Sequence, residues 1–110
     1  MSAATCIIYY GLRYEVSPAE IESLEARTDE RIVAARKAGL KFYWGNFSSP
    51  DERYLLFIGA PVGVMGPENQ TEARLSNEDF EKLTASVSTK LKSAGLEGSP
   101  QLHVQWQDDV

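Results

Sequence analysis

The segment Gln101–Gln107, QLHVQWQ, alternates polar and apolar side chains without a break. Successive side chains of a strand point to opposite faces, so this alternation predicts a strand with two distinct faces. One face carries Leu102, Val104 and Trp106, and His103 lies on the other. Residues 5–16, TCIIYYGLRYEV, show the same period of two, with apolar or aromatic side chains at every even position. These two segments predict the first and last strands of one sheet.

Two helical segments are expected between these strands. The first spans 17–39 and begins with an N-cap serine, a first-turn proline and a capping-box glutamate. Thr28 also resembles a fresh N-cap, which predicts one kinked helix or two abutting helices with a break near Arg27. The second helix spans 76–95, from a serine N-cap to a glycine stop.

Two further strands, 40–47 and 53–60, read as a hairpin around turn residues 48–51. The apolar run in 53–60 covers both faces, which is typical of a central strand. The order strand, helix, strand, strand, helix, strand is the split βαβ plan. We therefore predict one α+β domain over residues 1–110. It would be a two-layer ferredoxin-like plait (βαββαβ) with a mainly antiparallel sheet of four or five strands and two helices on one face.

Composition argues against several classes of partner. The 110 residues carry a net charge of −5, which disfavours a nucleic-acid partner because such binding depends on clustered lysine and arginine. No stretch has the roughly 18 apolar residues of a membrane helix, and the N-terminus lacks the pattern of a signal peptide. The expectation is a cytoplasmic protein that does not bind membranes. Cys6 is the only cysteine, so no intrachain disulfide can form.

His103 is the only histidine, and we expect it outside the main core. A single imidazole without carboxylates at ligand spacing predicts no metal site, and no cofactor motif is present. If the last strand lies beside the first, His103 approaches Tyr9 and Arg13 on the same face. These three residues are the weak catalytic candidates, as acid–base and anion-holding groups.

Two further sets of residues are candidates for binding. Trp44 and Asn46 share one side of their strand and would line a pocket if that side is open. The segment 61–70 is predicted to be a long loop that approaches a ligand closely. Its candidate binding residues are Gly63, Gly66 and Asn69.

The face opposite the helices would be apolar if the even positions pack on the helices. It would then present Ile7, Leu55 and Phe57, which need a cover. A homodimer through this sheet face is the economical solution.

Three functions follow as hypotheses. The first is a non-enzymatic interaction or small-ligand-binding module that works as this homodimer. The second is a small enzyme with a pocket between the open sheet face and the 61–70 loop. The third is an acidic, inhibitor-like protein that blocks a basic protein through its helix carboxylates.

Overall fold

The computed structural model describes residues 5–47, 53–67 and 69–107, and four strands in this part of the chain form one antiparallel sheet. The strands are β1 (Thr5–Val16), β2 (Lys41–Asn46), β3 (Tyr54–Met65) and β4 (Gln101–Gln107), in the sheet order β2-β3-β1-β4. All three neighbouring pairs are antiparallel. The predicted α+β class and antiparallel sheet are confirmed. The predicted turn at 48–51 lies outside the described residues.

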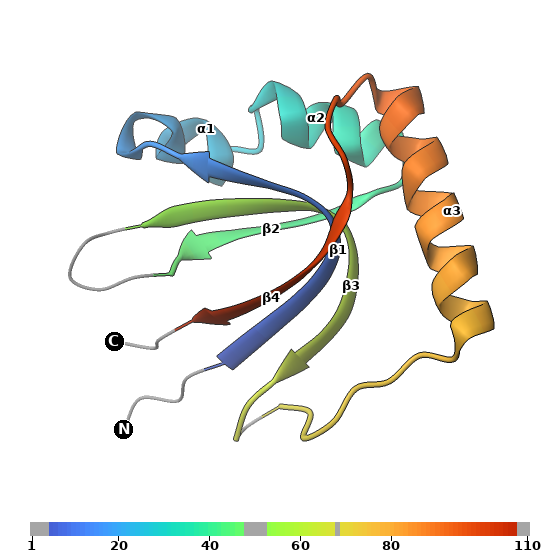
Figure 1. Ribbon diagram of the computed structural model, residues 1–110. Coiled ribbons are helices and arrows are strands. Elements are labelled where there is room, and N and C mark those ends of the chain that lie inside the picture. The colour runs from blue at the N-terminus through green and yellow to red at the C-terminus, as the bar shows by residue number, and fades with distance from the viewer. Residues whose placement is uncertain (1–4, 48–52, 68, 108–110) are drawn as a thin grey trace.

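The helices connect β1 to β2 and β3 to β4 (Figure 1). A 3₁₀ turn, η1 (Pro18–Glu20), leads into α1 (Ile21–Glu25) and α2 (Glu30–Lys37), and α3 (Asn77–Ala94) follows β3. None of the helices in the described residues is both long enough and apolar enough to span a membrane.

The predicted break in the first helical segment is confirmed. Arg27 adopts a φ of 59°, in the left-handed region, and separates α1 from α2. The N-cap of α2 is Asp29, whose carboxylate accepts the backbone N–H of Arg31 at 2.9 Å. The expectation of a cap at Thr28 is wrong by one residue, because the Thr28 hydroxyl donates backward to the Ser23 carbonyl at 3.5 Å and does not accept a helix N–H. A charged carboxylate is also the stronger acceptor.

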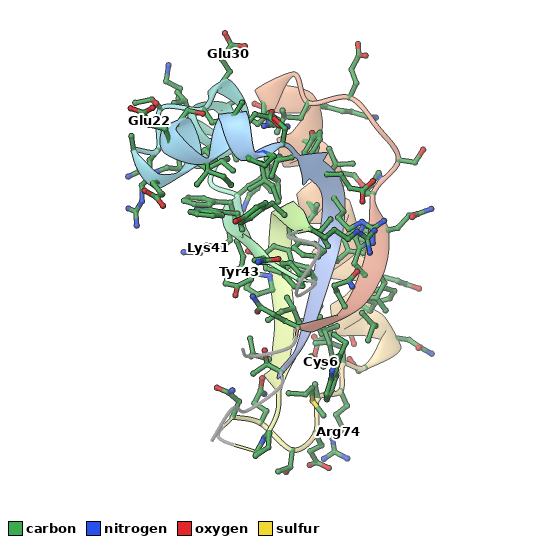
Figure 2. The ribbon with its side chains drawn as sticks, turned by 90° about the vertical axis from the view of Figure 1, so that its left-hand side faces the viewer. Cys6, Glu22, Glu30, Lys41, Tyr43 and Arg74 are labelled. Atoms are coloured by element: carbon green, nitrogen blue, oxygen red, sulfur yellow. The ribbon has the colours of Figure 1, made fainter. Side chains whose placement is uncertain are left out.

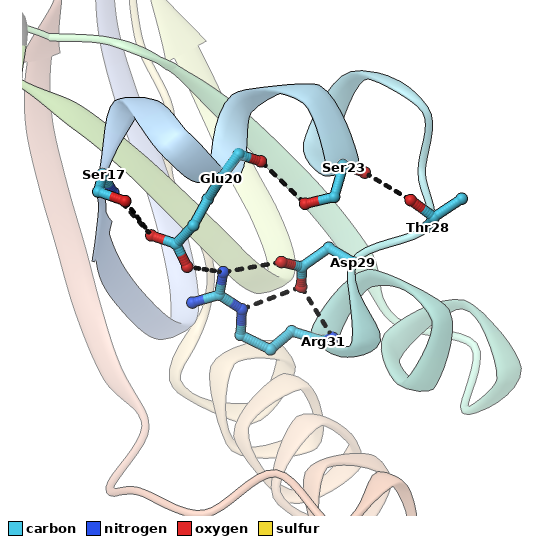
Figure 3. Close-up of polar contacts among 6 residues, drawn as sticks. All are labelled: Ser17, Glu20, Ser23, Thr28, Asp29 and Arg31. Carbon is cyan, nitrogen blue, oxygen red and sulfur yellow. Dashed lines mark hydrogen bonds and ion pairs between the residues drawn. The ribbon is translucent and has the colours of Figure 1, made fainter.

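Arg31 joins the two helical pieces (Figure 3). Its guanidinium lies 2.9 Å from Glu20 and 2.9 Å from Asp29, and 5.0 Å above the Tyr14 ring. The hydrogen bonds from Arg31 are the main cause of the lowered pKa of Asp29. For Glu20 the main cause of the lowered pKa is the backbone N–H of Ser17. This cluster holds α1 and α2 against β1.

β3 is longer than predicted and continues to Met65, so the first half of the 61–70 segment is strand. Tyr9 pairs with Pro61, whereas Ile8 pairs with Gly63, which leaves Val62 as the extra residue of a β-bulge. Bulges tolerate a proline within a strand because the ladder is already interrupted there.

The central strands bend at a pair of glycines. Gly11 of β1 lies opposite Gly59 of β3, with φ angles of 152° and 155° that L-residues rarely adopt. A Cβ atom on Gly59 would lie 2.0 Å from the Tyr10 carbonyl oxygen, and one on Gly11 would lie 2.1 Å from the Ile58 carbonyl oxygen. Only glycine permits this approach of the two backbones.

The glycine pair divides the sheet into two halves. β2 pairs with β3 from Tyr54 to Gly59, and β4 pairs with β1 from Thr5 to Gly11. We call the first part the β2 half-sheet (β2 with 54–59 and 11–16) and the second the β4 half-sheet (β4 with 5–11 and 60–65). β1 and β3 run through both halves and curve strongly along their length (Figure 1).

The bend creates two cores. The helices cover one face, where the buried residues are Leu12, Val16, Leu24, Ile32, Ala35, Leu40, Leu56, Ile58, Val87 and Leu91. The two half-sheets enclose a second core on the helix-free face, formed by Ile7, Tyr9, Phe47, Leu55 and Phe57. The sheet face that faces away from the helices is therefore largely covered by the sheet itself.

β4 keeps the alternation that its sequence suggested, but its apolar face is the more exposed of the two. Leu102, Val104 and Trp106 are 49%, 63% and 56% exposed, whereas His103 is half-buried on the helix-free face. The reason is that α3 packs mainly against α2, β1 and β3, so the apolar side of β4 receives little cover. His103 does lie outside the helix-side core, as expected, but it belongs to the wall of the second core.

The steric limit at the bend is testable by substitution. We expect Gly59→Ala to destabilise the fold by more than about 3 kcal/mol, because the new Cβ meets backbone that cannot move aside. Gly95→Ala is the matched control, since Gly95 also has a positive φ of 72° but no atom within 4 Å of the added Cβ. It should cost about 1 kcal/mol in urea denaturation. Equal losses for the two variants would contradict the role of the glycine pair.

Candidate functional site

A pocket opens where the two half-sheets face each other. Its volume is about 430 Å³, within the range of small-ligand sites. The β4 half-sheet and its bulge contribute Thr5, Ile7, Tyr9, Pro61 and Val64, and β2 contributes Lys41, Phe42 and Tyr43. The lining is mainly apolar, with a few polar groups. We call it the half-sheet pocket.

The hydroxyl of Tyr9 is the polar group best placed for a ligand. Tyr9 is only 4% exposed, and its ring lies 5.7 Å from that of Phe57. No described residue is hydrogen-bonded to its hydroxyl, and no fully buried side-chain oxygen in the described residues lacks a partner. The Tyr9 oxygen is therefore not fully enclosed, and Tyr9 is one of the residues that line the pocket. Burial raises the pKa of Tyr9 to about 12, so the group is a neutral donor at physiological pH.

Lys41 supplies a positive charge at the rim. Lys41 is exposed. It lies two residues before Tyr43 in β2, so the two side chains share one face of the strand (Figure 2). None of the ion pairs found in residues 5–47, 53–67 and 69–107 involves Lys41. An anionic group on a ligand would find this charge available.

Gln107 closes the sheet across the helix-free face. The Tyr43 hydroxyl donates to its side-chain oxygen at 2.8 Å, and its amide nitrogen donates to the Asn46 backbone carbonyl at 3.2 Å. Gly45 makes room for this contact, because a Cβ there would lie 2.9 Å from the Gln107 amide nitrogen. The two edge strands of the sheet thus touch through side chains. The Tyr43 hydroxyl is committed to this link.

His103 and Arg13 lie near Tyr9, as the strand parity indicated. His103 is paired directly with Tyr9 across β1 and β4. Its Nε2 lies 3.1 Å from the Gly11 carbonyl oxygen, which makes Nε2 the protonated nitrogen. Arg13 donates to the Gln105 side chain at 3.0 Å. Both groups therefore have structural partners, and Tyr9 alone of the three lines the pocket.

Trp44 and Asn46 do not contribute side chains to the pocket lining. Trp44 packs against the helix-side core, and Asn46 follows on the same face of β2. The condition for their binding role, an open face on that side, is not met because the helices occupy it. Trp44 is therefore a core residue, as tryptophans in strands commonly are.

The glycine-rich segment uses its backbone groups internally. Gly66 donates its N–H to the Gln70 carbonyl, and Asn69 donates to the Gly66 carbonyl, both at 3.1 Å. At Gly63 a Cβ would lie 3.0 Å from the Cβ of Ala73, so glycine there admits the returning chain. These contacts give the glycines a packing role.

The residues assigned to a dimer interface are buried within a single chain. Ile7 is 4% exposed, and Leu55 and Phe57 are 0% exposed. The premise of an uncovered apolar face is wrong, because the bend at the glycine pair folds this face onto itself. Periodicity identified the face but contained no information about the bend.

Metal ligands and the single cysteine were also considered among residues 5–47, 53–67 and 69–107 as the basis of a site. The described residues contain no cluster of three or more His, Cys, Asp or Glu side chains suited to a metal ion. Cys6 is half-buried and free.

Lys41 was not among the candidate site residues that the sequence suggested. The only signal in the sequence was its two-residue spacing from Tyr43, which places both side chains on the same face of the strand.

Comparison of the chain with protein-family models, curated proteins and solved structures finds no match.

The burial of His103 predicts a pH-dependent stability. Desolvation lowers its pKa in the folded state below the ordinary value of about 6.5, so the unfolded chain binds the proton more readily. The stabilisation is complete above about pH 6.5 and decreases as the pH falls toward the folded-state pKa. We expect urea midpoints to decrease from pH 7.5 to 5.5, and His103→Gln to reduce that decrease. An identical pH slope in the variant would contradict this assignment.

Proposed function

We propose that the chain is a binding module for a small, largely apolar molecule that carries an anionic group, held in the half-sheet pocket. The observation that carries this proposal is Tyr9, a residue that is 4% exposed, lines an apolar pocket and has a hydroxyl without a partner in the described chain. A neutral hydroxyl donor in an apolar lining offers a ligand acceptor a hydrogen bond that fixes the orientation of the ligand.

The ligand chemistry follows from the lining. Ile7, Pro61 and Val64 offer apolar contacts, Tyr9 offers one neutral donor, and Lys41 offers a charge at the rim. Such a combination suits a ring-containing or branched hydrocarbon with a carboxylate or sulfonate. A molecule of this kind would place its apolar body between the half-sheets and its anion near Lys41.

The finer fold assignment is also a proposal. We infer that the domain is a ferredoxin-like plait that is bent at Gly11 and Gly59. The central position of β1 and β3, flanked by β4 and β2, supports it, as do the helical connections after β1 and after β3.

The other two hypotheses have less support. An enzyme would need His103 or Arg13 as a free group, and both already have partners. An acidic inhibitor would use helix carboxylates; Glu20 and Asp29 already pair with Arg31, and the exposed Glu22, Glu25 and Glu30 offer charge alone. Small-molecule binding needs none of these groups.

The fluorescent probe 1-anilinonaphthalene-8-sulfonate tests the proposal, because it combines aromatic rings with an anion. We expect saturable binding with one probe per chain in a fluorescence titration. Tyr9→Phe should weaken binding by about 2- to 10-fold through loss of one hydrogen bond. Val64→Trp should abolish binding by filling the pocket. Unchanged affinity in both variants would overturn the assignment.

Charge is tested separately. Lys41→Gln should weaken binding of the sulfonate by up to about 5-fold, as expected for an exposed ion pair. Lys92→Gln, at an exposed position in the last turn of α3, is the matched control and should have no effect. The neutral analogue N-phenyl-1-naphthylamine should bind wild type and Lys41→Gln equally. A Lys92→Gln effect as large as that of Lys41→Gln would show that only net charge matters.

A further inference from the structure

β4 is an edge strand, and the side of it that lies on the helix-side face of the sheet is apolar and exposed. In the described part of the chain it pairs only with β1. Leu102 is 49% exposed and Val104 is 63% exposed, and the nearby Leu75 is 43% exposed. An uncovered edge of this kind is a template for pairing with another strand.

The strand carries none of the charges that usually protect an edge. Gln101–Gln107 contains no Lys, Arg, Asp or Glu, and its proline neighbour lies before the strand. The chain as a whole has a net charge of −5, so two copies repel each other over most of their surface. β4 is a stretch where two copies meet without bringing like charges together.

We propose that β4 pairs antiparallel with β4 of a second copy, about a two-fold axis that passes at Val104. The two four-stranded sheets would then form one continuous sheet of eight strands. Antiparallel pairing of identical strands satisfies the two-fold symmetry that is commonest in homodimers.

The sequence of β4 is self-complementary in this register. A two-fold axis perpendicular to the sheet keeps each face continuous, so residues pair only with residues of the same parity. Centring on Val104 pairs all seven residues of the strand, and any other centre pairs fewer. Leu102 then lies opposite Trp106 of the partner subunit, and Val104 lies opposite Val104 of the partner subunit. On the helix-side face of the joined sheet, each apolar side chain of β4 then lies opposite an apolar side chain of the partner subunit.

A groove beside Leu102 fits the large side chain that this register brings to it. The groove has a volume of about 310 Å³ and lies between β4, the start of α3 and the segment before α3. Its lining includes Leu75, Phe80, Leu102 and Val104. Opposed residues of paired strands have Cβ atoms about 5 Å apart, which brings Trp106 of the partner subunit to this groove. The indole is 56% exposed in the single chain and would gain apolar cover there.

The other edge of the sheet is less suited to pairing. β2 begins with the charged Lys41, and the remaining side chains of β2 are already half-buried. Its Asn46 carbonyl is also occupied by Gln107. The proposed dimer leaves β2 and the half-sheet pocket free, so it stands independently of the proposed function.

Light scattering with size-exclusion chromatography tests the assembly. We expect wild type to have twice the chain mass. Val104→Lys should raise the dissociation constant at least about tenfold, because two ammonium groups then face each other across the axis. Val33→Lys is the matched control, since Val33 is an exposed valine on α2, and it should remain dimeric. A monomeric wild type at the highest attainable concentration overturns the proposal, and so does a dimer unaffected by Val104→Lys.

Cysteine cross-linking tests the register and remains informative if Val104→Lys does not fold. In a Cys6→Ser background, Val104→Cys should form a covalent dimer on oxidation, because opposed Cα atoms lie within disulfide reach. Leu102→Cys is the control on the same face, since its two copies would be offset by four residues, roughly 14 Å along the strand. Efficient cross-linking at Leu102 and none at Val104 would overturn the proposed axis.

Discussion

The approach of two backbones at Gly11 and Gly59 is the constraint on which the rest of the structure depends. A Cβ atom at either position would lie 2.0 to 2.1 Å from a carbonyl oxygen of the other strand. With no side chain there, β1 and β3 bend together and carry β2 and β4 toward each other on the helix-free face. The hydrogen bonds of Gln107 to Tyr43 and to the Asn46 backbone complete this closure.

The bend allows a single chain to bury the apolar, helix-free face of its sheet. A four-stranded sheet with helices on one side leaves its other side to water, and here that side carries Phe57 and Leu55, both 0% exposed. The half-sheets bury these residues against Tyr9 and Phe47. Where the two halves diverge, the half-sheet pocket remains, with Tyr9 in its lining. Fold and candidate site thus have the same physical origin.

The bend also decides which surface is left for association. It brings the polar side of β4, with His103 and Gln105, into contact with the rest of the chain. The apolar side of the same strand then lies on the helix-side face of the sheet, where α3 leaves most of it uncovered. Exposure on this strand is therefore set by the shape of the sheet, and the chemical character of each face did not predict it.

The sequence by itself determined the local elements, because their signals act over a few residues. The alternation in β1 and β4, the Ser76 cap and Gly95 stop of α3, and the break at Arg27 could all be identified without tertiary contacts. The proximity of His103 to Tyr9 also followed from strand parity and order. Only the tertiary structure decided that Ile7, Leu55 and Phe57 are covered within the chain, that Trp44 faces the helices and that Val104 faces solvent. The reason is that the bend requires two glycines from distant parts of the chain to lie opposite each other, and a single strand pattern does not encode that pairing.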